Sequence, residues 1–94
     1  MFTQRELNFI DTNYFRVIQM SGYFVTLQSR NTFHCWHVLS QSYGKGSACQ
    51  IFHTHHEYAP YHFHGRASCI ETAVYLIKEH DNYQLSKSVY KKKS

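Results

Sequence analysis

Hydrophobic and polar residues alternate along residues 14–39, where β-branched and aromatic side chains dominate. A period of two places successive side chains on opposite faces of a strand, so this stretch predicts β structure. Turn residues at Ser21-Gly22 and Arg30-Asn31 divide it into three strands, which we predict to pair antiparallel. Residues 48–53 repeat the alternation and predict a fourth strand.

The two faces of this sheet follow from pairing residues outward from two-residue turns. The predicted core face carries Ile18, Met20, Tyr23, Val25, Leu27, Trp36 and Val38. The opposite face carries Phe15, Val17, Gln19, Phe24, Thr26, Gln28, Cys35 and His37. Because this second face is also rich in apolar side chains, we expect it to be partly covered or used for binding.

Two further segments have the pattern of amphipathic helices. Thr3 and Glu6 match the S/T-x-x-E capping box and predict a short helix that ends near Asp11. A second capping box begins at Ser68, and the apolar positions that follow have helical spacing: Ile70, Ala73, Val74 and Ile77. We predict this helix over residues 68–80, with Asp81-Asn82 as its end.

The order of these elements predicts an α+β fold, in which a four-stranded antiparallel sheet carries a short N-terminal helix and a long C-terminal helix packed on one face. The chain has 94 residues, enough for one hydrophobic core. We expect residues 1–86 to form a single domain and residues 87–94 to form a basic, disordered tail. There is no apolar run of about 18 residues and no basic leader, so we expect no membrane span and a cytoplasmic location.

The net charge of the chain comes from its end. The formal charge is +4, but Lys87, Lys91, Lys92 and Lys93 lie in the last eight residues. The rest of the chain carries six basic and six acidic residues, so it has no basic excess. A tail of this kind adds weak, non-specific attraction to nucleic acids. The three cysteines, Cys35, Cys49 and Cys69, contain no C-x-x-C pair, and we expect reduced thiols.

Histidine is the most unusual component of the sequence. The chain has eight histidines, and five of them lie within residues 53–64. Residues i and i+2 of a strand point the same way, so His53 with His55, and His62 with His64, can each offer two imidazoles to one face. Two such pairs on adjoining strands can form a tetrahedral Zn²⁺ site. The alternative is that they are polar surface residues among aromatic neighbours, since their spacing matches no recognised zinc motif.

The same segment is also rich in aromatic side chains and is interrupted by Pro60. A loop between the last strand and the main helix can project from a rigid scaffold and bind a partner. Aromatic and arginine side chains dominate protein interfaces, and aromatic rings also stack on single-stranded nucleic acids. We therefore predict a contact surface formed by Tyr58, Tyr61, His62, Phe63, His64 and Arg66. No convincing active site is evident, so we expect a protein that is not an enzyme.

The phrases NTFHCWHVL and CIETAVYLIKEHDNYQL, together with the capped opening helix, resemble short uncharacterised proteins of phages and mobile elements of Gram-positive bacteria. Such proteins are often inhibitors of host defence, including anti-CRISPR proteins. The resemblance implies an inhibitor that binds a host defence nuclease or nucleoprotein such as a CRISPR effector nuclease. We expect this inhibitor to be non-enzymatic and to be a monomer or weak dimer. The positive charge of this chain departs from inhibitors that are acidic DNA mimics. The alternatives are a small nucleic-acid-binding module and a His-rich zinc-binding protein, and only the latter requires a cofactor.

Overall fold

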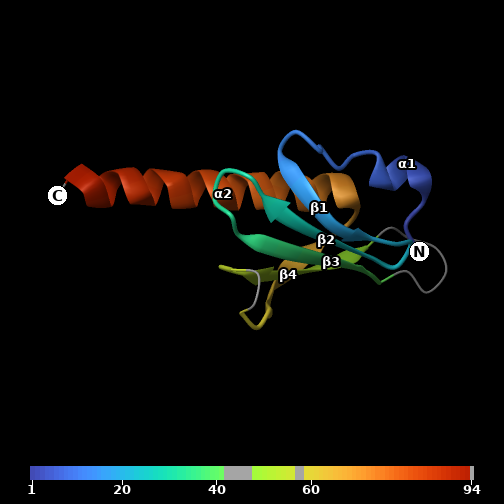
Figure 1. Ribbon diagram of the computed structural model, residues 1–94. Coiled ribbons are helices and arrows are strands. Elements are labelled where there is room, and N and C mark those ends of the chain that lie inside the picture. Colours follow the sequence, from blue (N-terminus) through green and yellow to red (C-terminus); the bar gives the residue numbers. More distant parts are fainter. Residues whose placement is uncertain (42–47, 57–58, 94) are drawn as a thin grey trace.

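The computed structural model describes residues 1–41, 48–56 and 59–93, with side chains inside these ranges described up to residue 87. It confirms the α+β class. The elements in chain order are α1 (Gln4–Leu7), β1 (Phe15–Met20), β2 (Phe24–Ser29), β3 (Cys35–Ser40), β4 (Cys49–Thr54), β5 (His62–Ala67) and α2 (Ile70–Lys93). The strands form one five-stranded antiparallel sheet in which each strand pairs with the next along the chain. Helix α2 lies across one face of this sheet (Figure 1).

The prediction of four strands was wrong by one, because β5 pairs with β4 along its whole length. From the sequence we expected a loop in this segment, interrupted by Pro60. Gly65 lies inside the strand and pairs with Ile51, while Phe63 pairs with Phe52. His64 is therefore an additional residue between two paired neighbours, which makes this irregularity a β-bulge.

A second irregularity changes the faces of β1. The β1–β2 register shifts between Val17 and Gln19, and the inserted residue is Ile18. Phe15 is consequently fully buried and Val17 packs against the core, whereas Met20 and Tyr23 are 41% and 65% exposed. The predicted placement of Phe15 and Val17 on the outer face was wrong. Ile18, predicted in the core, is the inserted residue. Met20 does pair with Val25 of the core face, but the predicted burial of Met20 and Tyr23 was wrong.

The turn between β2 and β3 spans residues 30–33 instead of two residues. The backbone N–H of Ser29 donates to the carbonyl of His34, and Phe33 has a positive φ of 64°. Leu27 therefore pairs with Trp36, two residues further along than predicted. A shift of two residues keeps every side chain on its face. The predicted burial of Val25, Leu27, Trp36 and Val38 is confirmed.

Helix α2 does not end at Asp81-Asn82 as predicted but runs from Ile70 through Lys93. The segment 87–93, predicted as a tail, continues this helix, and the C-terminal half of α2 extends beyond the sheet (Figure 1). Asp81 does not stop the helix because its buried carboxylate accepts hydrogen bonds from the hydroxyls of Tyr14, at 2.6 Å, and Thr32, at 3.0 Å. These two bonds attach the middle of α2 to the end of the sheet.

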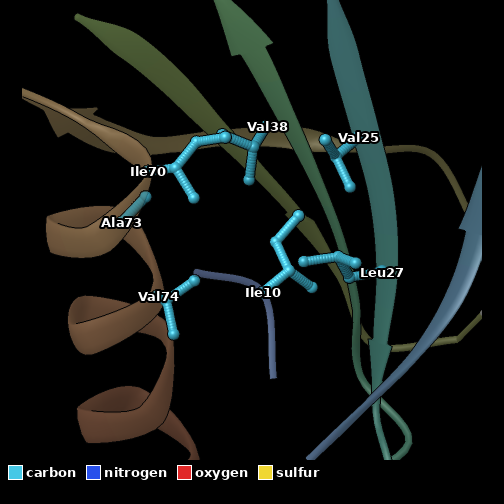
Figure 2. A pocket seen from close by; sticks show the side chains of 7 residues that line it. All are labelled: Ile10, Val25, Leu27, Val38, Ile70, Ala73 and Val74. Atoms are coloured by element: carbon cyan, nitrogen blue, oxygen red, sulfur yellow. The ribbon is translucent and has the colours of Figure 1, made fainter. Parts of the chain in front are cut away.

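The opening helix has the predicted capping box, in which Thr3 and Glu6 each satisfy a backbone N–H of the other. Helices and sheet enclose one apolar core, and Cys35, Cys49 and Cys69 form no disulfide in the described part of the chain. Figure 2 shows a small cavity in this core, lined only by apolar side chains: Ile10, Val25, Leu27, Val38, Ile70, Ala73 and Val74. A cavity without polar groups offers nothing to bind a polar ligand. Within the described ranges, no helix has the length and apolar character needed to cross a membrane.

Candidate metal centre

A cluster of six histidines lies between the sheet and α2. Its members come from the residue that precedes β3, from β4 and the segment after it, from β5 and from α2: His34, His53, His55, His62, His64 and His80. His53 is central, because its ring centroid lies 4.9–5.7 Å from the centroids of the other five. We call this group the histidine cluster.

His53 belongs to the core face of β4, where it follows the inward-pointing Cys49 and Ile51 at intervals of two residues. Its imidazole is only 2% exposed and stacks on the indole of Trp36, with 4.2 Å between ring centroids. The indole is itself fixed, because Trp36 Nε1–H donates to Ser29 Oγ at 3.1 Å. A rigid aromatic surface therefore orients the central imidazole.

Three members of the cluster are close enough to bind one ion. His34, His53 and His80 each offer a ring nitrogen, and these three nitrogens lie within 4.8 Å of one another. His53 Nε2 and His34 Nδ1 are 3.0 Å apart and share a hydrogen bond. The ligand nitrogens of a tetrahedral zinc site lie about 3.4 Å apart, because each Zn–N bond is about 2.0–2.1 Å long. The imidazoles would have to rotate to bring all three nitrogens to that spacing.

The third nitrogen is notable for its environment. His80 Nε2 is buried and has no hydrogen-bond partner among the described residues. Most buried polar atoms in proteins are satisfied, because an unpaired one costs about 1–3 kcal/mol. A metal ion beside His80 would use this lone pair and remove that cost.

The electrostatics of the cluster favour neutral imidazoles. Burial, and to a smaller extent the neighbouring histidines, together lower the pKa of His53 to about 3. Burial also lowers the pKa values of His34 and His80, and the charge of Asp81 opposes this effect for both. Neutral imidazole is the form that donates a lone pair to a metal. A nearby buried carboxylate additionally favours a cation over a neutral occupant.

The structure brings together the four histidines that the sequence indicated as metal ligands, with His53 buried and His55, His62 and His64 exposed around it. The most compact ligand set, however, combines His53 with His34 and His80, which sequence reasoning missed. Both lie outside residues 53–64, and His80 can be explained by the helix dipole alone. Helical periodicity could have indicated that His80 faces the sheet, since His80 follows the buried Ile77 by three residues on the apolar stripe of α2.

The predicted contact surface is divided between the two faces of the sheet. His62 and His64 belong to the histidine cluster. Phe63 lies on the outer face, where its ring contacts Phe52 and the Arg66 guanidinium carbon lies 5.9 Å from its centroid. Tyr61 lines a shallow groove on the same face with Gln19, Thr26, His37, Leu39 and Phe52. Tyr58 lies outside the described residues.

Comparisons of the chain with protein family models, with curated proteins and with solved structures found no match. The function is therefore inferred from the geometry and chemistry of the chain itself.

Proposed function

We propose that this protein binds one transition metal ion, with Zn²⁺ as the preferred ion, through His34, His53 and His80. The observation that carries the proposal is the convergence of three imidazole nitrogens within 4.8 Å, one of them buried without a partner. Imidazole ligands suit Zn²⁺, Cu²⁺ and Ni²⁺, whereas Mg²⁺ and Ca²⁺ require oxygen ligands. The histidine cluster offers nitrogen ligands, so it matches the first group of ions and not the second.

The three ligands belong to segments that are far apart in the sequence. His34 precedes β3, His53 lies in β4, and His80 lies in α2 one residue before the buried Asp81. An ion bound by all three would join α2 to the sheet at the point where the helix begins to extend beyond it. Because the unfolded chain offers no such preformed site, the free energy of metal binding adds to the stability of the fold.

Thermal unfolding of the metal-stripped protein, with and without Zn²⁺, tests this proposal. A free Zn²⁺ concentration of 100 times Kd should add about 2.7 kcal/mol, which raises Tm by about 10 °C or more for a chain of this size. His80→Gln should lose most of this gain. The matched control is His37→Asn, because His37 lies on the outer face, where its Nδ1 contacts Thr26 Oγ1 at 3.0 Å. A wild-type protein that gains no stability with Zn²⁺ would refute the proposal.

We also propose, as a second function, that the chain inhibits a bacterial defence nuclease or nucleoprotein, such as a CRISPR effector, through the outer face of the sheet. Its support is the resemblance carried by NTFHCWHVL and CIETAVYLIKEHDNYQL, together with the aromatic character of this face. Phe63 is 52% exposed and Tyr61 38% exposed, and Arg66 lies beside Phe63. Large aromatic and arginine side chains supply most of the binding energy at protein interfaces.

A plasmid-interference assay in a bacterial host with an active CRISPR nuclease tests the second function. Expression of the wild-type chain should raise the survival of a targeted plasmid, and Phe63→Ala should remove most of that protection. His80→Gln provides the matched control, because it affects the opposite face of the sheet. Unchanged plasmid loss in the presence of the wild-type chain would eliminate this function for the nuclease tested.

A further inference from the structure

The three buried or half-buried ligands leave one position of a tetrahedral zinc ion to be filled. We propose that His64 fills it, so that the ion is enclosed by four imidazoles and the site is structural. This inference rests on the proposed metal-binding function and specifies the kind of site. It predicts that no water molecule remains on the metal.

Five of the six ring-centroid distances in a set of His34, His53, His64 and His80 lie within about 1 Å of those in a site of four imidazoles. In such a site each ring centroid lies about 3.2 Å from the metal, so the centroids of two ligands lie about 5.2 Å apart. Within the set of three, the centroid distances are 5.0 Å for His34–His53, 4.9 Å for His53–His80 and 6.2 Å for His34–His80. His64 adds distances of 5.0 Å to His80 and 5.7 Å to His53.

His55 is the competing candidate. Its ring centroid lies 4.6 Å from that of His34 and 5.0 Å from that of His53. The distances alone therefore admit either histidine. The choice depends on how the backbone holds each of them.

His64 is held by a feature that directs its side chain into the cluster. It is the inserted residue of the β4–β5 bulge, between the pairs Phe63–Phe52 and Gly65–Ile51. Bulges occur near functional sites because they change the direction of a side chain while the strand continues. The His64 imidazole meets the indole of Trp36 edge-on at 5.2 Å, so the same ring that supports His53 also supports His64.

His55 lacks this support, because it lies after the end of β4 at Thr54. Metal ligands on paired strands and helices are positioned more accurately than ligands on loops. A ligand set of His34, His53, His64 and His80 joins the turn before β3 and the strands β4 and β5 to the middle of α2. Four imidazoles that surround the ion also favour tetrahedral ions such as Zn²⁺ and Co²⁺ over Cu²⁺ and Ni²⁺, which prefer square-planar coordination.

Titration of the metal-stripped full chain with Co²⁺ tests the inference, since tetrahedral Co²⁺ has intense visible absorption. His64→Ala should weaken Co²⁺ affinity by at least about 10–100-fold, the range measured for the loss of residues that only support a ligand. Added imidazole should restore the spectrum of this variant. His55→Ala and the outer-face control His37→Asn should bind Co²⁺ with unchanged affinity.

A second measurement does not depend on any variant. If four imidazoles enclose the ion, azide should leave the Co²⁺ spectrum of the wild-type protein unchanged, because no exchangeable ligand is present. A shifted spectrum would show an open position and overturn the inference. Loss of affinity in His55→Ala but not in His64→Ala would also overturn it, while the proposed metal function would stand. Failure of the wild-type protein to bind Co²⁺ or Zn²⁺ would overturn both.

Discussion

The indole of Trp36 stacks on the imidazole of His53, with 4.2 Å between ring centroids and 27° between ring planes. Trp36 is fully buried in the core, and His53 is the centre of the histidine cluster. The contact therefore connects the hydrophobic core directly to the proposed metal site. Because the chain has one tryptophan, tryptophan fluorescence reports on the surroundings of this one ring, which also include His64 and His80.

Trp36 fluorescence should be quenched when Cu²⁺ or Co²⁺ occupies the site. Both ions quench an adjacent indole, and imidazole binds both. We expect the titration to saturate at about one ion per chain and Zn²⁺ to reverse the quenching by competition. Quenching that does not saturate, or that is equally strong in His80→Gln, would show that the ion binds elsewhere.

The buried carboxylate of Asp81 should contribute strongly to stability. Asp81→Ala removes the acceptor for Tyr14 Oη and Thr32 Oγ1, and hydrogen bonds to a charged group are worth about 1.5–3 kcal/mol each. We expect urea unfolding to show a loss of at least about 2 kcal/mol.

Two tyrosine variants compare the stability lost with the hydrogen bond to the buried Asp81 and the stability lost with a similar hydrogen bond on the exposed surface. Tyr14→Phe removes one of the two donors to Asp81 and should cost about 1–2 kcal/mol. Tyr75→Phe removes a comparable bond to Glu79, formed at 2.7 Å on the exposed surface, and should cost less than about 0.5 kcal/mol. Equal costs for the two variants would mean that Asp81 does not anchor α2.

Stability of the metal-free protein should fall as the pH is lowered. The pKa values of His34, His53 and His80 are below the ordinary value of 6.5 in the folded state, chiefly because of burial. Below about pH 6.5 the unfolded chain therefore binds more protons than the folded chain, and stability decreases with decreasing pH. The loss continues toward the pKa of His53, about 3.

Thermal unfolding between about pH 7.5 and about pH 5 measures this dependence. His53→Phe provides the comparison, because it keeps a ring against Trp36 but removes the buried titratable group. Its Tm should depend less on pH than that of the wild-type protein. Identical pH profiles for the two proteins would show that His53 is not buried in its neutral form.

The observed burial in β1 predicts a contrast between two apolar residues of this strand. Phe15 is fully buried, and Phe15→Ala should cost about 3–5 kcal/mol. Met20→Ala should cost less than about 0.5 kcal/mol, because Met20 is 41% exposed. The register expected from two-residue turns predicts the opposite order, so urea unfolding of the two variants distinguishes the registers.

Much of the fold follows from local patterns in the sequence. The alternation of Val25, Leu27, Trp36 and Val38 is uninterrupted, so even a turn of the wrong length leaves their faces unchanged. The capping box of Thr3 and Glu6 and the apolar stripe of α2 depend only on nearby residues. The bulge at Ile18 could not be predicted, because an inserted residue moves the preceding side chains of the strand to the opposite face without any change in amino-acid composition.

The site was predictable only where its residues are close in sequence. The sequence has an unusual concentration of histidines in residues 53–64, and the structure places four of them together: His53, His55, His62 and His64. His34 joins them through the pairing of β3 with β4, whereas His80 joins them through the position of α2 on the sheet, where Asp81 accepts a hydrogen bond from Thr32. From the sequence alone, Asp81 is a typical helix end. Its burial against Tyr14 and Thr32 is a tertiary contact that no local pattern encodes.

Anomalous diffraction at the zinc edge from crystals of the Zn²⁺-loaded protein tests the central claim most directly. We predict one strong peak about 2.0–2.1 Å from His34 Nδ1, His53 Nε2 and His80 Nε2. A peak bound only by exposed histidines such as His55 and His62, or no peak at all, would contradict a metal site between the sheet and α2.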